Sequence, residues 1–124
     1  MGDDTKSVDE MMDERTYTYP GFADFLDTDH GFAEKYDAFV KYSLQRDTEG
    51  MSRKTRELVA TALLAAGGHP GPCRNHIEDA RRHGATEEEI LGAIHVAAVF
   101  EGATSVVVGA QAYEEAEHPD PADD

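Results

Sequence analysis

The feature that most constrains the fold is the stretch GGHPGPCRNHIEDARRHGAT, residues 67–86, which separates two apolar runs near the middle of the chain. Gly67 and Gly68 end the apolar run before it, because glycine is common at the C-terminus of a helix. Pro72 suits the first position of a new helix, where its missing N–H costs nothing, and Gly84 is a natural stop. The stretch therefore predicts three helices joined by two short turns, with a helical hairpin at the heart of the fold.

Aromatic residues before this central stretch also follow helical spacing. They recur every three or four positions over 22–44 and predict two helices whose aromatic stripes face the core. Asp29-His30-Gly31 is predicted to be the break between them. Ser52 is a good N-cap for the next helix, which we place over 53–66.

The chain after the central stretch is predicted to be helical as well. Thr86 and Glu89 form a capping box, which marks the start of a helix. Gly102 interrupts that helix, and a last helix is predicted over 103–117. The valines at 106–108 are the one ambiguous place, but no segment alternates convincingly between apolar and polar residues. We therefore expect an all-α fold.

Length and charge predict one helical domain between two acidic ends. With 124 residues, one domain is the strong expectation. We assign it to residues 20–117, after a disordered acidic N-terminal segment at 1–19 and before an acidic tail at 118–124.

The formal net charge is −15, and the segments 1–19 and 114–124 hold 12 of the 26 acidic residues. Such a chain should repel nucleic acid and anionic membranes. Two explanations of the acidity stay open: a surface adapted to high salt, or two solvated acidic tails on an ordinary domain.

Composition also bounds the location and the assembly of the protein. No apolar run approaches the roughly 20 residues of a membrane-spanning helix, and the first residues lack the apolar core of a signal peptide. We therefore expect a cytoplasmic protein. The one cysteine excludes an internal disulfide.

Glycine and alanine are dense over 92–112, which permits close helix packing. Because the apolar helices exceed what one subunit can hide, we expect a homo-oligomer.

Cys73 and His76 are the first candidates for chemistry. Three residues apart on a helix, they share one face. If Pro72 holds the first helical position, Cys73 holds the second, where free N–H groups and the helix dipole would stabilise a thiolate. His76 could then accept a proton or stabilise the thiolate further. The alternative is that Cys73 is a small buried apolar residue and His76 a capping or core hydrogen-bonding residue.

A metal site is a further alternative for the same stretch. His69, Cys73 and His76 offer three zinc ligands over eight residues, and Glu57 or His95 could supply a fourth. The usual CxxC or HxxxH spacing is absent, however. We therefore expect neither a metal nor an organic cofactor.

The order of these segments resembles the carboxymuconolactone decarboxylase and alkylhydroperoxidase D superfamily. The resemblance covers about residues 30–115, and KTRELVATALLAAGG, Cys73 to His76 and HIEDARRHGATEEEI carry it, followed by helices rich in small residues. It implies an alkylhydroperoxidase D-like helical subunit that assembles as a homotrimer or a homohexamer.

The alkylhydroperoxidase D branch implies a thiol peroxidase. In that branch a helical Glu, a CxxC pair and a later His form a proton relay with a redox dithiol. Glu57 and His76 match the Glu and the His, whereas the two cysteine positions fall on His69 and Pro72. A peroxidase made from this chain would therefore use Cys73 alone as nucleophile toward a peroxide, with an external thiol as reductant.

The decarboxylase branch implies a different activity. It also lacks the CxxC pair, retains the His, and acts on a muconolactone carboxylate without an organic cofactor. His76 or Glu57 would then move the proton, while Arg53, Arg56 or Arg74 would bind the anion.

The sequence therefore supports three hypotheses about function. The first is a single-cysteine, peroxidase-like oxidoreductase with Cys73, His76 and Glu57 as catalytic residues. The second is a cofactor-free decarboxylase of a small cyclic carboxylate. The third is an oligomeric binding protein without catalytic activity.

Overall fold

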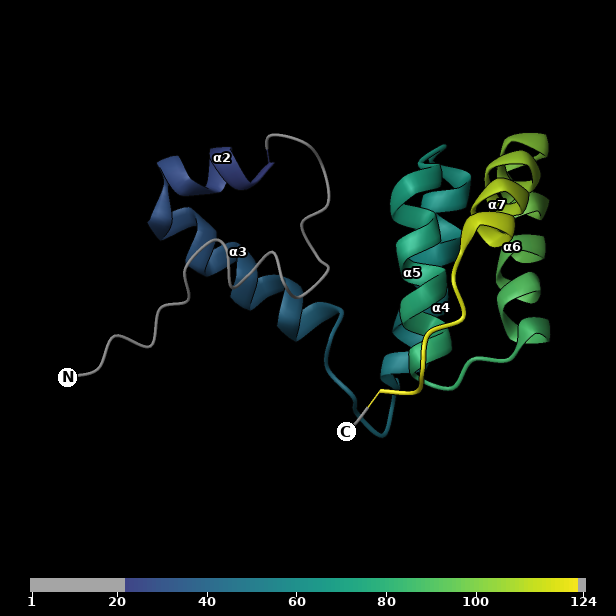
Figure 1. Ribbon diagram of the computed structural model, residues 1–124, viewed down its shortest axis with the longest axis horizontal. Coiled ribbons are helices and arrows are strands. Elements are labelled where there is room, and N and C mark those ends of the chain that lie inside the picture. The colour runs from purple at the N-terminus through teal and green to yellow at the C-terminus, as the bar shows by residue number, and fades with distance from the viewer. Residues whose placement is uncertain (1–21, 123–124) are drawn as a thin grey trace. The chain divides into compact units, whose positions relative to one another are not determined.

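The computed structural model describes residues 22–122, and in this part of the chain it contains helices and no strand. The all-α prediction is confirmed, and the valines at 106–108 are helical. The acidic segment predicted to be disordered, 1–19, lies outside the described residues. The helices, labelled in Figure 1, are α2 (Phe22–Thr28), α3 (His30–Ser43), α4 (Arg53–Ala66), α5 (Pro70–Arg82), α6 (Glu87–Glu101) and α7 (Ala103–Glu115).

The chain divides into two compact units, Met1–Arg46 and Asp47–Asp124, where the sequence predicted one domain over 20–117. In the first unit, the rings of Phe25 and Phe32 join α2 to α3 with centroids 6.0 Å apart. The prediction that the aromatic stripes face a core is wrong for these two residues, which are 55% and 43% exposed. Their ring contacts therefore lie along the surface of this unit.

The break between α2 and α3 is shorter than predicted. His30 and Gly31 belong to α3, and Asp29 alone separates the two helices. Asp29 Oδ1 accepts the N–H of Phe32 at 3.1 Å, so Asp29 is the N-cap of α3. Because a capping residue starts a helix directly after itself, the following glycine does not interrupt it.

The second unit holds α4 to α7 around one apolar core. α4 and α5 lie side by side and form the predicted central hairpin (Figure 1). α6 and α7 both pack against α4, and α7 also packs against α5. Small and branched apolar side chains make up the buried cluster: Ala65, Cys73, Ile77, Ile90, Ile94, Ala112 and Ala116.

Polar caps fix the starts of α4 and α6 as predicted. Ser52 Oγ accepts the N–H of Thr55 at 3.1 Å. Thr86 Oγ1 accepts the N–H of Glu89 at 3.1 Å, and Glu89 Oε1 accepts the N–H of Thr86 at 2.9 Å. The capping box of α6 is therefore confirmed.

The start of α5 differs from the prediction by two residues. Pro70 rather than Pro72 occupies the first position, and His69 is the residue before the helix. Pro72 is accommodated in the first turn because N–H groups there have no intrahelical acceptor. Cys73 is consequently the fourth residue of α5, and its N–H donates to the carbonyl of His69 at 3.0 Å.

The segment after α7 is held against the second unit without being helical. Arg81 Nη1 donates to the carbonyl of Ala116 at 3.2 Å, and the N–H of Ala122 donates to the carbonyl of Arg82 at 3.0 Å. The described part of the predicted tail 118–124 is thus tied to the end of α5. In the part of the chain that the structure describes, every helix is too short or too polar to span a bilayer.

Candidate acid–base site

Glu57 and His76, two of the three predicted catalytic residues, meet between α4 and α5. Each lies in the second turn of its helix. Nδ1 of His76 is 2.6 Å from Oε1 of Glu57, whose side chain is fully buried. This distance is short for a hydrogen bond between nitrogen and oxygen. A carboxylate beside one ring nitrogen orients the imidazole and favours a proton on that nitrogen.

The second oxygen of Glu57 is also engaged. Nε of Arg53 donates to Oε2 of Glu57 at 2.7 Å. The two residues are four apart on α4, so they share one face of the helix. Both oxygens of the buried Glu57 side chain are therefore held by polar partners, one on its own helix and one on α5.

The other ring nitrogen of His76, Nε2, faces solvent. It has no hydrogen-bond partner in the described part of the chain. Among the described residues, the Oγ of Ser105 is the one buried side-chain nitrogen or oxygen without a partner. Nε2 must therefore be reached by solvent, and the His76 side chain is 14% exposed. A proton can pass between this nitrogen and a bound molecule.

Cys73 is placed differently from the expectation for a reactive thiol. It is fully buried in the core, and its Sγ donates to the carbonyl of Thr61 at 3.5 Å. In the described residues no hydrogen bond joins the thiol to His76. Burial raises the pKa of Cys73 to about 11, whereas a reactive cysteine has a lowered pKa. Free N–H groups at the start of α5 were expected to stabilise a thiolate. Because α5 starts at Pro70, these groups belong to residues that precede Cys73.

The structure brings together one group of three possible metal ligands among the described residues, namely Glu57, His76 and Asp79. The metal ligands considered from the sequence were His69, Cys73 and His76, and this group shares only His76 with them. Two ligand atoms on one ion are typically about 3 Å apart, because each bond is about 2.1 Å long. The 2.6 Å between His76 Nδ1 and Glu57 Oε1 is shorter and fits a shared proton instead.

The contacts of Arg53 and Thr61 were not predicted from the sequence. Thr61 Oγ1 donates to the carbonyl of Glu57 at 2.9 Å and its own carbonyl accepts from Cys73. Arg53 was expected to bind a substrate anion. Arg53 and Glu57 are four residues apart on a predicted helix, and this spacing could have predicted their ion pair.

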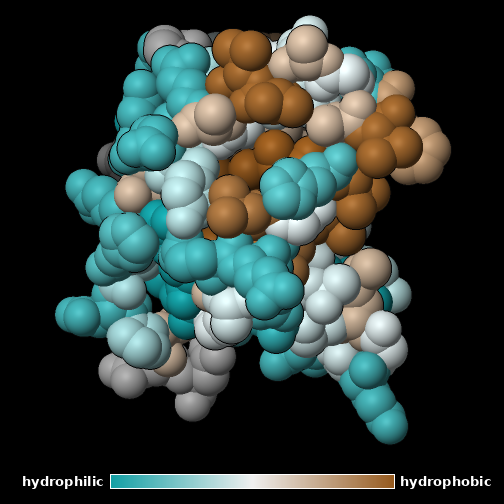
Figure 2. All heavy atoms as spheres, turned by 90° about the vertical axis from the view of Figure 1, so that its right-hand side faces the viewer, coloured by the Kyte–Doolittle hydropathy of each residue, from teal (hydrophilic) through white to brown (hydrophobic). Residues whose placement is uncertain are grey.

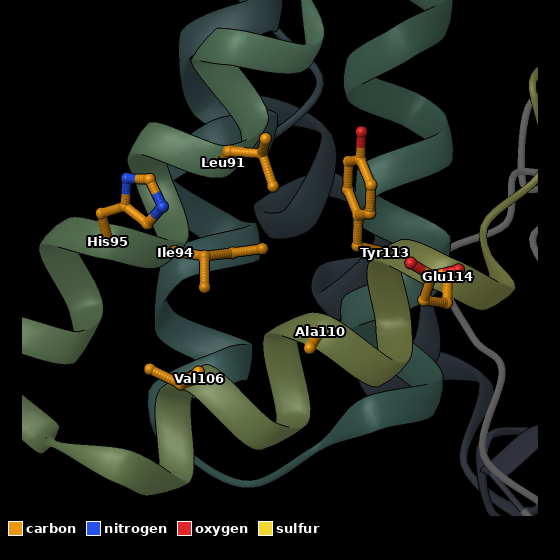
Figure 3. A pocket seen from close by; sticks show the side chains of 7 residues that line it. All are labelled: Leu91, Ile94, His95, Val106, Ala110, Tyr113 and Glu114. Atoms are coloured by element: carbon orange, nitrogen blue, oxygen red, sulfur yellow. The ribbon is translucent and has the colours of Figure 1, made fainter.

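A pocket of about 310 Å³ lies elsewhere in the second unit, between α6 and α7. Figure 3 shows Leu91 and Ile94 of α6 facing Tyr113 of α7, with His95 and Glu114 on opposite sides. Its lining residues are Leu91, Ile94, His95, Val106, Ala110, Tyr113 and Glu114. Because neither Glu57 nor His76 lines it, this pocket is separate from the acid–base pair.

Comparison with known proteins gives one family and one partial relative. The sequence model of the carboxymuconolactone decarboxylase family matches residues 31–115. A protein of Paracoccus denitrificans described as "Uncharacterized protein 4 in cox locus" is 38% identical over 63 residues, which are 50% of this chain and 57% of that protein. The match thus spans little more than half of the relative. No solved structure matches significantly.

Proposed function

This chain belongs to the carboxymuconolactone decarboxylase family, and from that premise we propose that it is a cofactor-free acid–base enzyme that removes CO₂ from a small cyclic carboxylate. The observation that supports this proposal best is the 2.6 Å hydrogen bond between His76 and the buried Glu57. This pair leaves Nε2 of His76 free to exchange a proton with a substrate. General acid–base catalysis of this kind contributes about 10²–10⁴-fold to a rate.

In the proposed reaction His76 is the proton donor. The bond between the ring carbon and the carboxylate breaks, CO₂ leaves, and the electron pair passes into the conjugated lactone carbonyl. The Nε2–H of the imidazolium then protonates carbon, and His76 takes a new proton from water. Glu57 orients the imidazole through Nδ1 and balances the positive charge that His76 carries while it donates the proton. One proton is consumed for each CO₂ released.

Arg74 is the best candidate to bind the substrate anion. Of the three arginines expected in that role, Arg53 is paired with Glu57 and Arg56 donates to Met51 and Thr48. Arg74, which also lies on α5, makes no ion pair in the described residues. Its guanidinium can hold a carboxylate through two parallel hydrogen bonds.

The single-cysteine peroxidase is less well supported. It requires a thiolate, and the burial that raises the pKa of Cys73 to about 11 works against one at neutral pH. A thiol reagent separates the two proposals. We expect Cys73 of the folded protein to stay unmodified at pH 7–8 for as long as the fold is intact, and reduction of hydrogen peroxide with dithiothreitol to be no faster than without protein. Rapid modification together with peroxide turnover would favour the peroxidase.

The decarboxylase proposal is tested by CO₂ release from carboxymuconolactone. His76→Ala should lower kcat/KM by about 10²–10⁴-fold, and Glu57→Gln should lower it as well, since the imidazolium loses its counter-charge. His118→Ala is the matched control, because His118 is 74% exposed and lies outside the site. Absence of CO₂ release by the wild-type protein, or equal rates for His76→Ala and His118→Ala, would refute the proposal. In that case the single-cysteine peroxidase and the non-catalytic binding protein remain, and the experiment with the thiol reagent separates them.

A further inference from the structure

The pocket of about 310 Å³ between α6 and α7 has no part in the proposed reaction. Its most buried lining residue is Ile94, which is 5% exposed and belongs to the apolar core. Leu91, Val106 and Ala110 form exposed apolar walls. The volume is at the lower end of the range for ligand pockets, which is about 300–1,000 Å³. The pocket therefore suits a molecule with a single ring or a short chain rather than a large organic cofactor.

Two polar side chains on opposite sides complete the lining, His95 of α6 and Glu114 of α7 (Figure 3). Both are exposed, and in the described part of the chain neither has a hydrogen bond or an ion pair with another residue. Ligand pockets typically combine apolar walls with a few polar groups of this kind, which orient the bound molecule. Because a carboxylate only accepts hydrogen bonds, the molecule needs a donor at the Glu114 side.

The other charges near this pocket, around the ring of Tyr113, are balanced. Cζ of Arg81 lies over that ring, 5.2 Å from its centroid. The guanidinium of Arg81 donates to both oxygens of Glu87, at 3.0 and 2.8 Å, and to two backbone carbonyls after α7. A hydrogen bond to Glu87 also engages the Tyr113 hydroxyl and raises its pKa. Tyr113 therefore offers its ring to the pocket, and Glu114 is the lining carboxylate that has no counter-charge in the described residues.

We propose that this pocket binds a small organic cation, namely a primary amine on an apolar ring or short chain. The apolar part lies between Leu91 and Tyr113, which face each other across the pocket (Figure 3), and the ammonium donates to Glu114. The net charge of −15 also favours a cation over an anion at this surface. Because the pocket is separate from the acid–base pair, this inference does not depend on the proposed decarboxylation.

The test is the titration of the full-length protein with phenethylamine at neutral pH, where a primary amine is protonated. NMR of the backbone amides should show saturable shifts at Leu91, Ala110 and Tyr113, with a Kd of about 1 mM, since so small a molecule buries little surface. Phenethyl alcohol and hydrocinnamate keep the phenyl ring and replace the ammonium by a neutral and an anionic group. The alcohol should bind up to about fivefold more weakly, which is the contribution of an exposed ion pair, and the anion more weakly still.

Two substitutions separate the charge of the pocket from its space. Glu114→Gln should weaken the binding of phenethylamine by up to about fivefold and leave the binding of phenethyl alcohol unchanged. Glu115→Gln is the matched control, because it removes the same charge from the next position of α7, outside the lining. Ala110→Phe should fill the pocket and abolish the binding of both molecules. If thermal unfolding shows that Ala110→Phe does not fold, the two glutamine variants decide.

Weaker binding of phenethylamine to Glu114→Gln than to Glu115→Gln supports the proposal. Equal affinities of the two variants, equal affinities of the wild type for phenethylamine and hydrocinnamate, or no saturable binding would overturn it.

A second copy of this chain is the alternative occupant, because the apolar walls of the pocket adjoin other exposed apolar residues of α6 and α7. Tyr113 and Glu114 lie at the end of α7 away from the turn between the two helices, whereas Phe100 lies beside that turn. A contact between copies around Phe100 can therefore leave the Glu114 end of the pocket open. A wild type that does not bind phenethylamine, together with a lower sedimentation coefficient of Ala110→Phe, would assign the pocket to the second copy and overturn the proposal.

Discussion

At the scale of single residues, Cys73 makes the most direct prediction about stability. Burial raises the pKa of its thiol from 9.0 to about 11. The folded protein therefore keeps the thiol proton over a pH range in which the unfolded chain loses it. The free energy of unfolding should fall as the pH rises from about 9 to about 11, by about 2 kcal/mol, since one pKa unit corresponds to about 1.4 kcal/mol.

Urea unfolding of wild type and Cys73→Ala at pH 8 and pH 10.5 measures this pH-dependent contribution of the thiol to the free energy of unfolding. The variant is expected to be less stable at pH 8, because it leaves a small cavity, and the two proteins should become more similar at pH 10.5. Tyrosines titrate in the same range but are present in both proteins, so the difference isolates the thiol. A stability gap that is independent of pH would show that the thiol proton is not held more tightly in the folded state.

The residues of the candidate site were only partly predictable from the sequence. Spacing and resemblance brought Glu57 and His76 to attention, and the structure places them in contact. The environment of Cys73 was not predictable, because two prolines two residues apart both suit a helix start. The choice of Pro72 over Pro70 placed Cys73 among the free N–H groups, whereas tertiary packing of α5 on α4 puts its thiol against a backbone carbonyl.

At the scale of helices, the close approach of α6 and α7 depends on Gly109. A Cβ at this position would lie 2.5 Å from Cγ2 of Ile94 and 3.1 Å from its Cδ1. Gly109→Ala should therefore lower the free energy of unfolding by about 1–3 kcal/mol, as overpacking does. Gly92 in α6 is the matched control, because nothing lies within 4 Å of a Cβ added there. Gly92→Ala should raise stability by about 0.5–1 kcal/mol through its better helix propensity.

Chemical denaturation of the two alanine variants checks this prediction through the sign of each change. Combining Gly109→Ala with Ile94→Ala should cost less than the sum of the single changes, since the clash disappears with the isoleucine side chain. Strictly additive effects would mean that Gly109 does not contact Ile94 closely in solution.

Helices were also the level at which the sequence was most informative. Ser52 and Thr86 marked two helix starts correctly, because a side chain that accepts an N–H three residues on is a local interaction. The exposure of Phe25 and Phe32 was not predictable in the same way. A helical stripe of aromatic residues shows which side chains share a face, and burial depends on what packs against that face.

At the scale of the whole molecule, the second unit carries a group of large, exposed apolar side chains. Figure 2 shows apolar side chains gathered on the side that α6 and α7 present. The exposed large apolar residues of these helices are Leu91, Val96, Val99, Phe100, Val106 and Val107. Val59 and Leu63 of α4 are exposed as well, and Leu63 and Phe100 border a second pocket of about 220 Å³. Such a surface marks an interface.

We propose that a second copy of this chain covers this face. The net charge of −15 should keep copies apart, but residues 90–112 contain one acidic residue, Glu101, and no lysine or arginine. Two copies can therefore approach through this face with little repulsion, whereas an oppositely charged partner would find few charges to recognise there.

Sedimentation of the wild-type protein should accordingly show a homotrimer or a homohexamer. Phe100, which is 81% exposed, is the residue to change, because Phe100→Glu places a charge in the apolar face and should shift the protein to monomers. Gly50→Glu adds the same charge in an open loop and should leave the assembly unchanged. A monomeric wild type, or equal dissociation of the two variants, would contradict self-association through α6 and α7. Salt provides a second criterion, because it screens charges. An assembly held by its apolar faces should be stronger at high KCl, where the repulsion between like-charged copies is screened. An assembly held by ion pairs would instead be weaker at high KCl.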